Sequence, residues 1–157
     1  QLMEVNFFGN IALAKAVLPI FRAQNSGQFL VVSSIAGKFG FHLRSIYSAS
    51  KAALVGYYES LAMEEAPNGI SVTLAFPGKI NTPISKSALT GSGHAHGAMD
   101  HNQATGMPVE ECVRLMLLAL SKGKREVLIG GKELLAVFLK RFFPRLFWKL
   151  IPKQPAT

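Results

Sequence analysis

The stretch QFLVVSS at residues 28–34 decides the fold class, because four apolar residues in a row end at two serines. Two similar short runs, rich in Val, Ile, Leu and Phe, occupy residues 70–76 and 126–129. Short, continuous apolar runs are typical of strands that are buried on both faces of a parallel sheet. We therefore predict three parallel strands at these positions.

Helical patterns alternate with the predicted strands. Residues 3–23 form the first, residues 46–66 the second, which a Pro-Asn-Gly sequence at 67–69 ends, and residues 108–122 the third. The third has Pro108 at its first position and two acidic residues in its first turn, and both features favour a helix start. This alternation predicts the α/β class, with a doubly wound parallel sheet.

The predicted strand at 28–34 indicates that the sheet extends beyond this sequence. A fully apolar strand needs a neighbour on each side, because a long bare edge favours aggregation, and the sequence offers partners on one side only. The sequence also begins at Gln1, without an initiator methionine. We therefore expect residues 1–131 to be the C-terminal part of a larger domain, with its last three strands and their helices but without its N-terminal strands.

Charge divides the chain into two parts. Residues 132–157 carry six Lys or Arg against one Glu, whereas residues 1–131 carry eleven against eight acidic residues. A diffuse excess of this size, without a basic stripe, argues against nucleic-acid binding. The single Cys112 excludes an internal disulfide, and we expect it to be a small core residue. No uninterrupted apolar run reaches the roughly 18 residues of a membrane-spanning helix, so we expect none.

Ser34, Tyr47 and Lys51 could form one proton-transfer device. In a helix over 46–66, Tyr47 and Lys51 are four residues apart, so their side chains leave one face about 6 Å apart along the axis. An ammonium favours the ionised form of a nearby phenol. A serine at the end of the strand could donate to a reacting carbonyl oxygen. An isolated Tyr-x-x-x-Lys is usually an ordinary exposed helical pair, so further motifs must decide.

Four motifs in order resemble the short-chain dehydrogenase/reductase family. They are Asn6 in EVNFFG (4–9), SSIAG (33–37), YSASK (47–51), and Pro77-Gly78 followed by Thr82. The resemblance covers nearly the whole chain but only the C-terminal part of that family's domain. It implies a Rossmann-like fold and a nicotinamide cofactor, NAD or NADP. The family's glycine-rich phosphate turn has no counterpart in the sequence, so we expect the chain by itself to be inactive.

The resemblance also implies a role for each matching residue. Tyr47 would be the general acid/base, Ser34 would hold the substrate oxygen, and Lys51 would assist Tyr47 and bind the nicotinamide ribose. The backbone carbonyl of Asn6 would hold a water that links Lys51 to solvent. The nicotinamide carboxamide would dock at a turn made of Pro77, Gly78, Ile80 and Thr82.

Residues 83–107 are rich in Gly, Ser, Ala and His, with little periodicity. Long segments of this kind are usually functional or disordered, and we interpret this one as a substrate lid. The sequence around it resembles the "member 7" branch of the family, which is associated with membranes and lipophilic carbonyls. Three histidines, His94, His96 and His101, suggest a metal site, but only Asp100 could help to complete it, so we expect substrate contacts and no metal.

Residues 132–157 form a basic, aromatic-rich tail with an amphipathic pattern over 133–153. Such a helix can lie in a membrane interface, where anionic lipids attract its basic residues, and Pro144 would kink it. Alternatively, its apolar face packs on the domain, closes the substrate pocket or joins subunits. The resemblance further implies a homo-oligomer with contacts through helices 3–23 and 46–66, in a cytoplasmic protein that can associate with membranes.

These patterns lead to one main functional expectation. We expect an oxidoreductase that uses NAD or NADP to interconvert a carbonyl and an alcohol, with a lipophilic substrate. The alternative is a truncated, non-catalytic remnant or interaction module that cannot bind the cofactor. Cofactor-dependent turnover, and its loss in Tyr47→Phe, would separate the two.

Overall fold

The computed structural model describes residues 1–82 and 105–153. Within them the chain forms a parallel sheet in the order β1 (Gly27–Val32), β2 (Ile70–Pro77) and β3 (Glu126–Ile129). The three predicted strands are confirmed, and β3 has the predicted bounds. The first strand is two residues shorter at its end than predicted, because Ser33 and Ser34 leave it for the 3-10 turn η2 (Ile35–Gly37).

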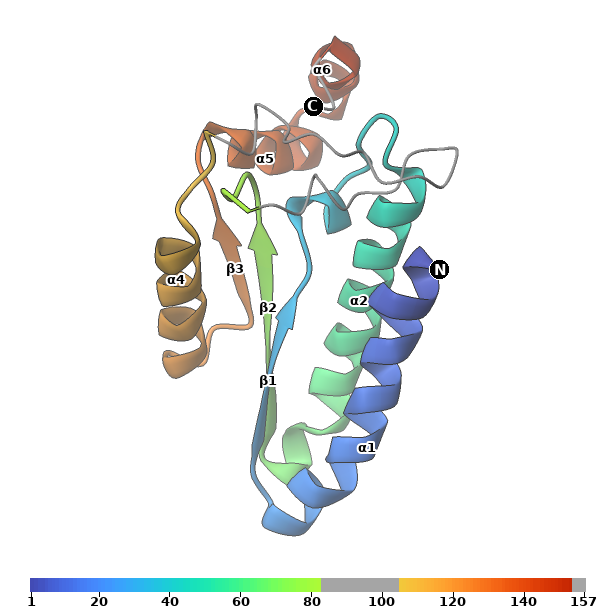
Figure 1. Ribbon diagram of the computed structural model, residues 1–157, viewed down its shortest axis with the longest axis vertical. Coiled ribbons are helices and arrows are strands. Elements are labelled where there is room, and N and C mark those ends of the chain that lie inside the picture. Colours follow the sequence, from blue (N-terminus) through green and yellow to red (C-terminus); the bar gives the residue numbers. More distant parts are fainter. Residues whose placement is uncertain (83–104, 154–157) are drawn as a thin grey trace.

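Helices cover both faces of this sheet (Figure 1). α1 (Gly9–Gln24) and α2 (Ser45–Glu64) lie side by side on one face, and α4 (Val109–Ser121) lies on the other. A π-helical turn, η1 (Glu4–Phe8), leads into α1 without a break. The three predicted helices are confirmed to within two residues at each end, and with them the doubly wound α/β class.

Residues 83–104, which make up most of the predicted lid, lie outside the described residues, as do its three histidines. Only residues 105–107 of that segment are described, and they lie against the turn that follows β2. Met107 forms a bridge with Ile80. The lid and its substrate contacts therefore remain predictions.

The turn between α2 and β2 shows why a glycine ends the Pro-Asn-Gly sequence. The 3-10 turn η3 (Ala66–Asn68) ends at Gly69, whose φ of 68° lies in the left-handed region. A Cβ at Gly69 would lie 2.3 Å from the backbone oxygen of Asn25, at the end of α1. Both the backbone conformation and this close approach therefore require glycine.

The main hydrophobic core lies between the sheet and the layer of α1 and α2, with Phe76 and Leu54 almost completely buried. A smaller cluster on the other face contains Cys112 and Met116 of α4. Cys112 is therefore confirmed as a core residue, and burial raises the pKa of its thiol. Each fully buried large apolar side chain stabilises the fold by about 1.5–3 kcal/mol relative to an exposed one.

One helix within the described residues is long and apolar enough to cross a membrane by length and composition alone. It is Glu4–Gln24, with 21 residues and a mean hydropathy of 1.2. The expectation of no such helix counted only uninterrupted apolar runs, whereas this helix contains isolated polar residues, and length and composition alone leave that expectation a prediction. Ala14 and Leu18 are buried in the core, but only 11% of the apolar window of this helix is buried.

The tail divides at Pro144. Before it lie η5 (Lys132–Leu134) and α5 (Leu135–Phe142), and after it lie α6 (Pro144–Leu150) and η6 (Ile151–Lys153). Pro144 begins a new helix instead of kinking a continuous one, because the fixed φ of proline suits the first helical position. In Figure 1, α5 crosses the carboxyl ends of the strands and α6 lies beyond it.

Part of the tail packs on the domain. Phe147 is fully buried, and its ring centre lies 5.3 Å from that of Phe39. The ammonium of Lys140 donates to the carbonyl oxygen of Lys38 over 3.0 Å. Most of the other large apolar side chains of α5 and α6 are exposed, so the tail has a packed side and an apolar side that faces outward.

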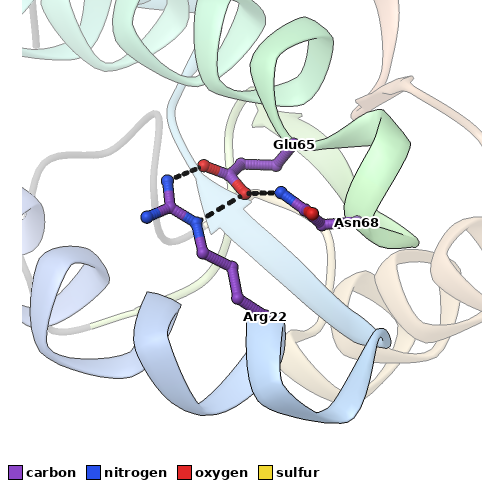
Figure 2. Close-up of polar contacts among 3 residues, drawn as sticks. All are labelled: Arg22, Glu65 and Asn68. Carbon is purple, nitrogen blue, oxygen red and sulfur yellow. Dashed lines mark hydrogen bonds and ion pairs between the residues drawn. The ribbon is translucent and has the colours of Figure 1, made fainter.

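The ends of α1 and α2 nearest the amino ends of the strands are joined by a buried carboxylate (Figure 2). Glu65, which is 2% exposed, accepts hydrogen bonds from both Nε and Nη2 of Arg22 and from Nδ2 of Asn68. The Nε bond is 3.0 Å long and the Asn68 bond 2.8 Å. Hydrogen bonds from Arg22 and Asn68 hold the pKa of the Glu65 carboxyl below its usual range.

Candidate active site

The first two turns of α2 hold the predicted tyrosine and lysine. The ammonium nitrogen of Lys51 lies 5.9 Å from the centre of the Tyr47 ring, so the two side chains are neighbours, as their spacing predicts. Lys51 also donates to the carbonyl oxygen of Val32 over 3.0 Å, at the carboxyl end of β1. Burial lowers the pKa of Lys51, because a low-dielectric surrounding disfavours the charged form.

Tight contact between η2 and α2 fixes this helix against the end of β1. The hydroxyl of Ser33 donates to the backbone oxygen of Lys51 over 2.9 Å. A Cβ at Gly37 would lie 2.6 Å from the Ser33 hydroxyl oxygen and 2.9 Å from the Lys51 backbone oxygen. The glycine of SSIAG is therefore required by close approach, and it helps to set the position of Lys51.

Ser34 lies where β1 and β2 end together. Its hydroxyl oxygen accepts a hydrogen bond from the backbone N–H of Ala36 over 3.1 Å and so caps η2. The same hydroxyl donates to the carbonyl oxygen of Pro77 over 3.4 Å, which is near the upper limit for such a bond. Ser34 and the predicted cofactor turn are thus brought together from positions 43 residues apart.

Asn6 lies in the π-helical turn η1, and such turns are frequent at functional sites. Its side-chain amide donates to the hydroxyl of Ser50 over 3.1 Å, and that hydroxyl donates to the backbone oxygen of Tyr47 over 2.8 Å. Sequence analysis assigned a role to the Asn6 backbone and none to Ser50, which is fully buried. The signal in the sequence was that Ser50 is a polar residue inside the predicted helix, between Tyr47 and Lys51.

The turn after β2 carries the remaining predicted residues. The backbone N–H of Gly78 donates to Ile129 over 2.7 Å, and backbone bonds of 2.9 Å join Lys79 and Asn81 to Met107. Ile80 and Thr82 are partly buried beside this contact. Among residues 1–82 and 105–153, no hydrogen bond joins Ile80 or Thr82 to Ser34, Tyr47 or Lys51, so only Pro77 links this turn directly to the others.

Glu133 is a further residue at this turn that sequence analysis missed. Its carboxylate oxygen accepts hydrogen bonds from the backbone N–H of Lys79 over 2.8 Å and of Gly131 over 3.1 Å. Glu133 is also the only acidic residue among the many basic ones of the tail. That isolation was a signal in the sequence that could have drawn attention to it.

The described residues contain no group of three His, Cys, Asp or Glu side chains that could hold a metal ion. The hydroxyl of Ser34 lies at the carboxyl ends of β1 and β2, and the ammonium of Lys51 contacts the last residue of β1, Val32, and lies beside the Tyr47 ring. This set of donors suits hydroxyl groups and a carbonyl oxygen. In open α/β sheets, ligands bind in the crevice outside the carboxyl ends of the strands.

Comparison with known proteins identifies close relatives. The chain is 39% identical over 152 residues to "Dehydrogenase/reductase SDR family member 7B" of Xenopus laevis. It is 37% identical over 155 residues to "Dehydrogenase/reductase SDR family protein 7-like" of Anopheles gambiae. These matches cover 96% and 98% of the chain but 47% and 49% of the two relatives. The chain therefore spans about half the length of the curated relatives it matches, whose names agree with the branch that its sequence resembles.

Solved structures show the same fold. A short chain dehydrogenase from Burkholderia cenocepacia, in complex with NADP, has a TM-score of 0.78 at 26% identity, over 98% of this chain and 58% of that one. One from Burkholderia phymatum, in complex with NAD, has a TM-score of 0.75 at 20% identity, over 99% of this chain and 60% of that one. The second likeness concerns the fold alone.

A sequence profile of the family described as "short chain dehydrogenase" matches residues 1–92, more than half of the chain. The matched segment includes the four motifs at 4–9, 33–37, 47–51 and 77–82. Each of these motifs lies at or beside the carboxyl end of the sheet. The chain therefore belongs to the short-chain dehydrogenase/reductase family.

Proposed function

We propose that the complete protein is an oxidoreductase that interconverts a carbonyl and an alcohol with NAD or NADP. The observation that carries this proposal is that Ser34 lies at the shared end of β1 and β2, while Lys51 lies beside the Tyr47 ring and donates to the carbonyl oxygen of Val32, two residues before Ser34. Membership of the family supports it, as does the structural neighbour of 26% identity that was solved with NADP.

Each residue would act through an ordinary polar interaction. Ser34 would donate to the substrate oxygen, and Tyr47 would give that oxygen a proton or take one from it, which stabilises the charge that develops there. Lys51, which lies beside the Tyr47 ring, would assist Tyr47 in this role. Asn6 and Ser50 would support the first turns of α2 through their hydrogen bonds. When bound, the nicotinamide supplies or accepts the hydride.

The nicotinamide end of the cofactor suits the residues present. The ammonium of Lys51 can bind ribose hydroxyls, and the turn from Pro77 to Thr82 offers backbone groups and a hydroxyl to the carboxamide. The phosphate-binding turn of the family has no counterpart in this sequence. We therefore propose that residues 1–157 by themselves do not turn over substrate.

Turnover by the complete gene product tests this function. Absorbance at 340 nm would be followed with a panel of carbonyl and alcohol substrates and either cofactor. Tyr47→Phe, which removes only the phenolic hydroxyl, is expected to lower kcat roughly 10²- to 10⁴-fold. Tyr57→Phe, ten residues further along the same helix, is the matched control and should keep activity. Full activity in Tyr47→Phe would contradict the mechanism.

The alternative function, a non-catalytic interaction module, makes a different prediction. It requires that the complete gene product bind neither NAD nor NADP and show no turnover. Binding of either cofactor with turnover that depends on Tyr47 would exclude it.

We further propose that the tail contacts a membrane surface and that the substrate is lipophilic. The exposed apolar side chains of the tail are Leu135, Phe138, Phe142, Phe143, Leu146, Trp148 and Leu150. They are interleaved with the basic residues Lys140, Arg141, Arg145 and Lys149. Aromatic and basic side chains together favour an anionic lipid interface. The tail lies at the end of the sheet that holds the candidate site (Figure 1), so a lipophilic substrate could enter from the bilayer.

Vesicle sedimentation tests the tail. The chain of residues 1–157 should sediment with anionic vesicles more than with neutral ones. Phe142→Ser with Phe143→Ser should reduce this binding, whereas Leu117→Ser, at an exposed position on α4, should not. Equal sedimentation of all three proteins would contradict the proposal.

A homo-oligomer that uses α1 and α2 is part of the same proposal. Leu13 and Ile20 of α1 and Met63 of α2 are all more than half exposed. Light scattering should show a dimer or larger species that Leu13→Glu with Ile20→Glu converts to monomers. A monomeric wild-type protein would contradict this part of the proposal.

A further inference from the structure

The carboxylate of Glu133 joins two turns at the carboxyl end of the sheet. One oxygen accepts the backbone N–H of Lys79, in the turn after β2, and the N–H of Gly131, in the turn after β3. Lys79 and Glu133 are 54 residues apart in the sequence. A single side chain from the start of the tail thus holds the predicted cofactor turn, after β2, against the turn that follows β3.

Glycines make room for this carboxylate on two sides. A Cβ at Gly78 would lie 2.4 Å from the bonded oxygen of Glu133, and a Cβ at Gly130 would lie 2.5 Å from it. Gly130 also has a φ of 157°, which other residues rarely adopt. Larger side chains at either glycine would collide with the carboxylate, so the pocket suits Glu133 closely.

The environment of Glu133 keeps it charged. Burial acts to raise the pKa of its carboxyl, but the backbone N–H groups of Lys79, Gly131 and Glu133 itself outweigh this effect and hold the pKa below its usual range. Hydrogen bonds to an ionised acceptor are roughly twice as strong as neutral ones. The contact is therefore a pair of charge-assisted hydrogen bonds between the two turns.

We propose that Glu133 is a positioning residue, which holds the turn at Pro77, Gly78 and Lys79 in the geometry that docks the nicotinamide. This inference rests on the proposed function. Glu133 acts through backbone groups and does not touch the reacting atoms. The Pro77 carbonyl, two residues before Lys79, also accepts the hydroxyl of Ser34, so the turn that Glu133 holds is also in contact with Ser34.

Three variants of the complete gene product test this role. Glu133→Ala removes the acceptor, Glu133→Gln keeps an oxygen acceptor without the charge, and Glu111→Ala removes an exposed carboxylate from α4 as a control. Cofactor affinity would be measured by fluorescence titration, kcat and KM by absorbance, and backbone exchange at Lys79 and Gly131 by hydrogen–deuterium exchange.

Glu133→Ala is expected to weaken cofactor affinity about tenfold, which corresponds to about 1.4 kcal/mol, and to raise KM for the cofactor more than it lowers kcat. Exchange at Lys79 and Gly131 should accelerate. Glu133→Gln should fall between wild type and Glu133→Ala, and Glu111→Ala should match wild type. If Glu133→Ala does not fold, Glu133→Gln replaces it in the test. A cofactor affinity at least threefold below that of wild type would then support the positioning role.

The outcomes separate the two proposals. Unchanged cofactor affinity in the Glu133 variants, with or without faster exchange, overturns the positioning role and leaves the proposed function intact. A wild-type protein that binds neither NAD nor NADP overturns both, because there is then no cofactor to position.

Discussion

Glu65 at the amino end of the sheet, and Ser34 and Lys51 at its carboxyl end, differ in how far their hydrogen-bonding capacity is used. At the amino end, the buried carboxylate of Glu65 is saturated by Arg22 and Asn68, through short bonds (Figure 2). At the carboxyl end, the hydroxyl of Ser34 donates over 3.4 Å, and the ammonium of Lys51 donates to the carbonyl oxygen of Val32 and lies 5.9 Å from the centre of the Tyr47 ring. Groups saturated by one another stabilise a fold, whereas groups with remaining capacity can bind a ligand. The difference assigns stability to one end and chemistry to the other.

The largest expected effect tests the carboxyl end. Lys51→Met keeps the length of the side chain and removes its charge, so turnover of the complete gene product should fall roughly 10²- to 10⁴-fold. The melting temperature should change little, because the lost hydrogen bond to Val32 lies at a strand end. Calorimetry and the absorbance assay together measure both quantities. Lys15→Met, at an exposed position on α1, is the control. A large drop in melting temperature with full activity in Lys51→Met would contradict the assignment of chemistry to the carboxyl end.

The second effect tests the amino end. Glu65→Ala leaves Arg22 and Asn68 without their shared acceptor, so the melting temperature should fall by several degrees. Turnover per folded molecule should stay unchanged at temperatures well below melting, because this end of the sheet lies far from the candidate site (Figure 1). Glu64→Ala, at the adjacent exposed position, is the control. A loss of turnover without a loss of stability would contradict the division between the two ends.

Gly37→Ala should affect stability and chemistry together. The added methyl group would lie within 3 Å of the Ser33 hydroxyl and the Lys51 backbone, and such overpacking typically costs about 1–3 kcal/mol. Since α2 must move to relieve the contact, turnover should also fall. Gly56→Ala is a matched control, because a Cβ there meets nothing within 4 Å and alanine is the better helix former. Wild-type stability in Gly37→Ala would show that the contact is not as tight as described.

Local motifs and distant contacts differed in how far sequence could predict them. Motifs predicted Ser34, Tyr47 and Lys51 because each contains unusual residue types at fixed spacing on one element or at its end. Apolar runs predicted the strands to within two residues, because burial on both faces requires continuous apolar sequence.

Contacts between segments that are distant in the sequence produce no motif or apolar run by which they could be predicted. Glu65, Ser50 and Glu133 gain their roles from partners 43, 44 and 54 residues away, and nothing in their local sequence states which partner they meet. The burial of Phe147 against Phe39 agrees with the alternative that the tail packs on the domain, between which and membrane contact the amphipathic pattern of the tail could not decide. Residues whose roles arise from tertiary contacts therefore required the structure.

The smallest expected effect is a dependence of stability on pH that originates at the amino end. Hydrogen bonds from Arg22 and Asn68 lower the pKa of Glu65 in the folded protein, below the value of about 4.3 that an unfolded glutamate has. Its contribution to stability is therefore fully present above pH 4.3 and is lost as the pH falls through the folded pKa. Urea unfolding of the complete gene product between pH 6 and pH 3 should show a steeper loss of stability for wild type than for Glu65→Gln. Glu111→Gln removes an exposed carboxylate whose pKa is lowered by Arg114, and it should change the slope less. Parallel curves for wild type and Glu65→Gln would mean that the buried cluster does not set the acid stability of this fold.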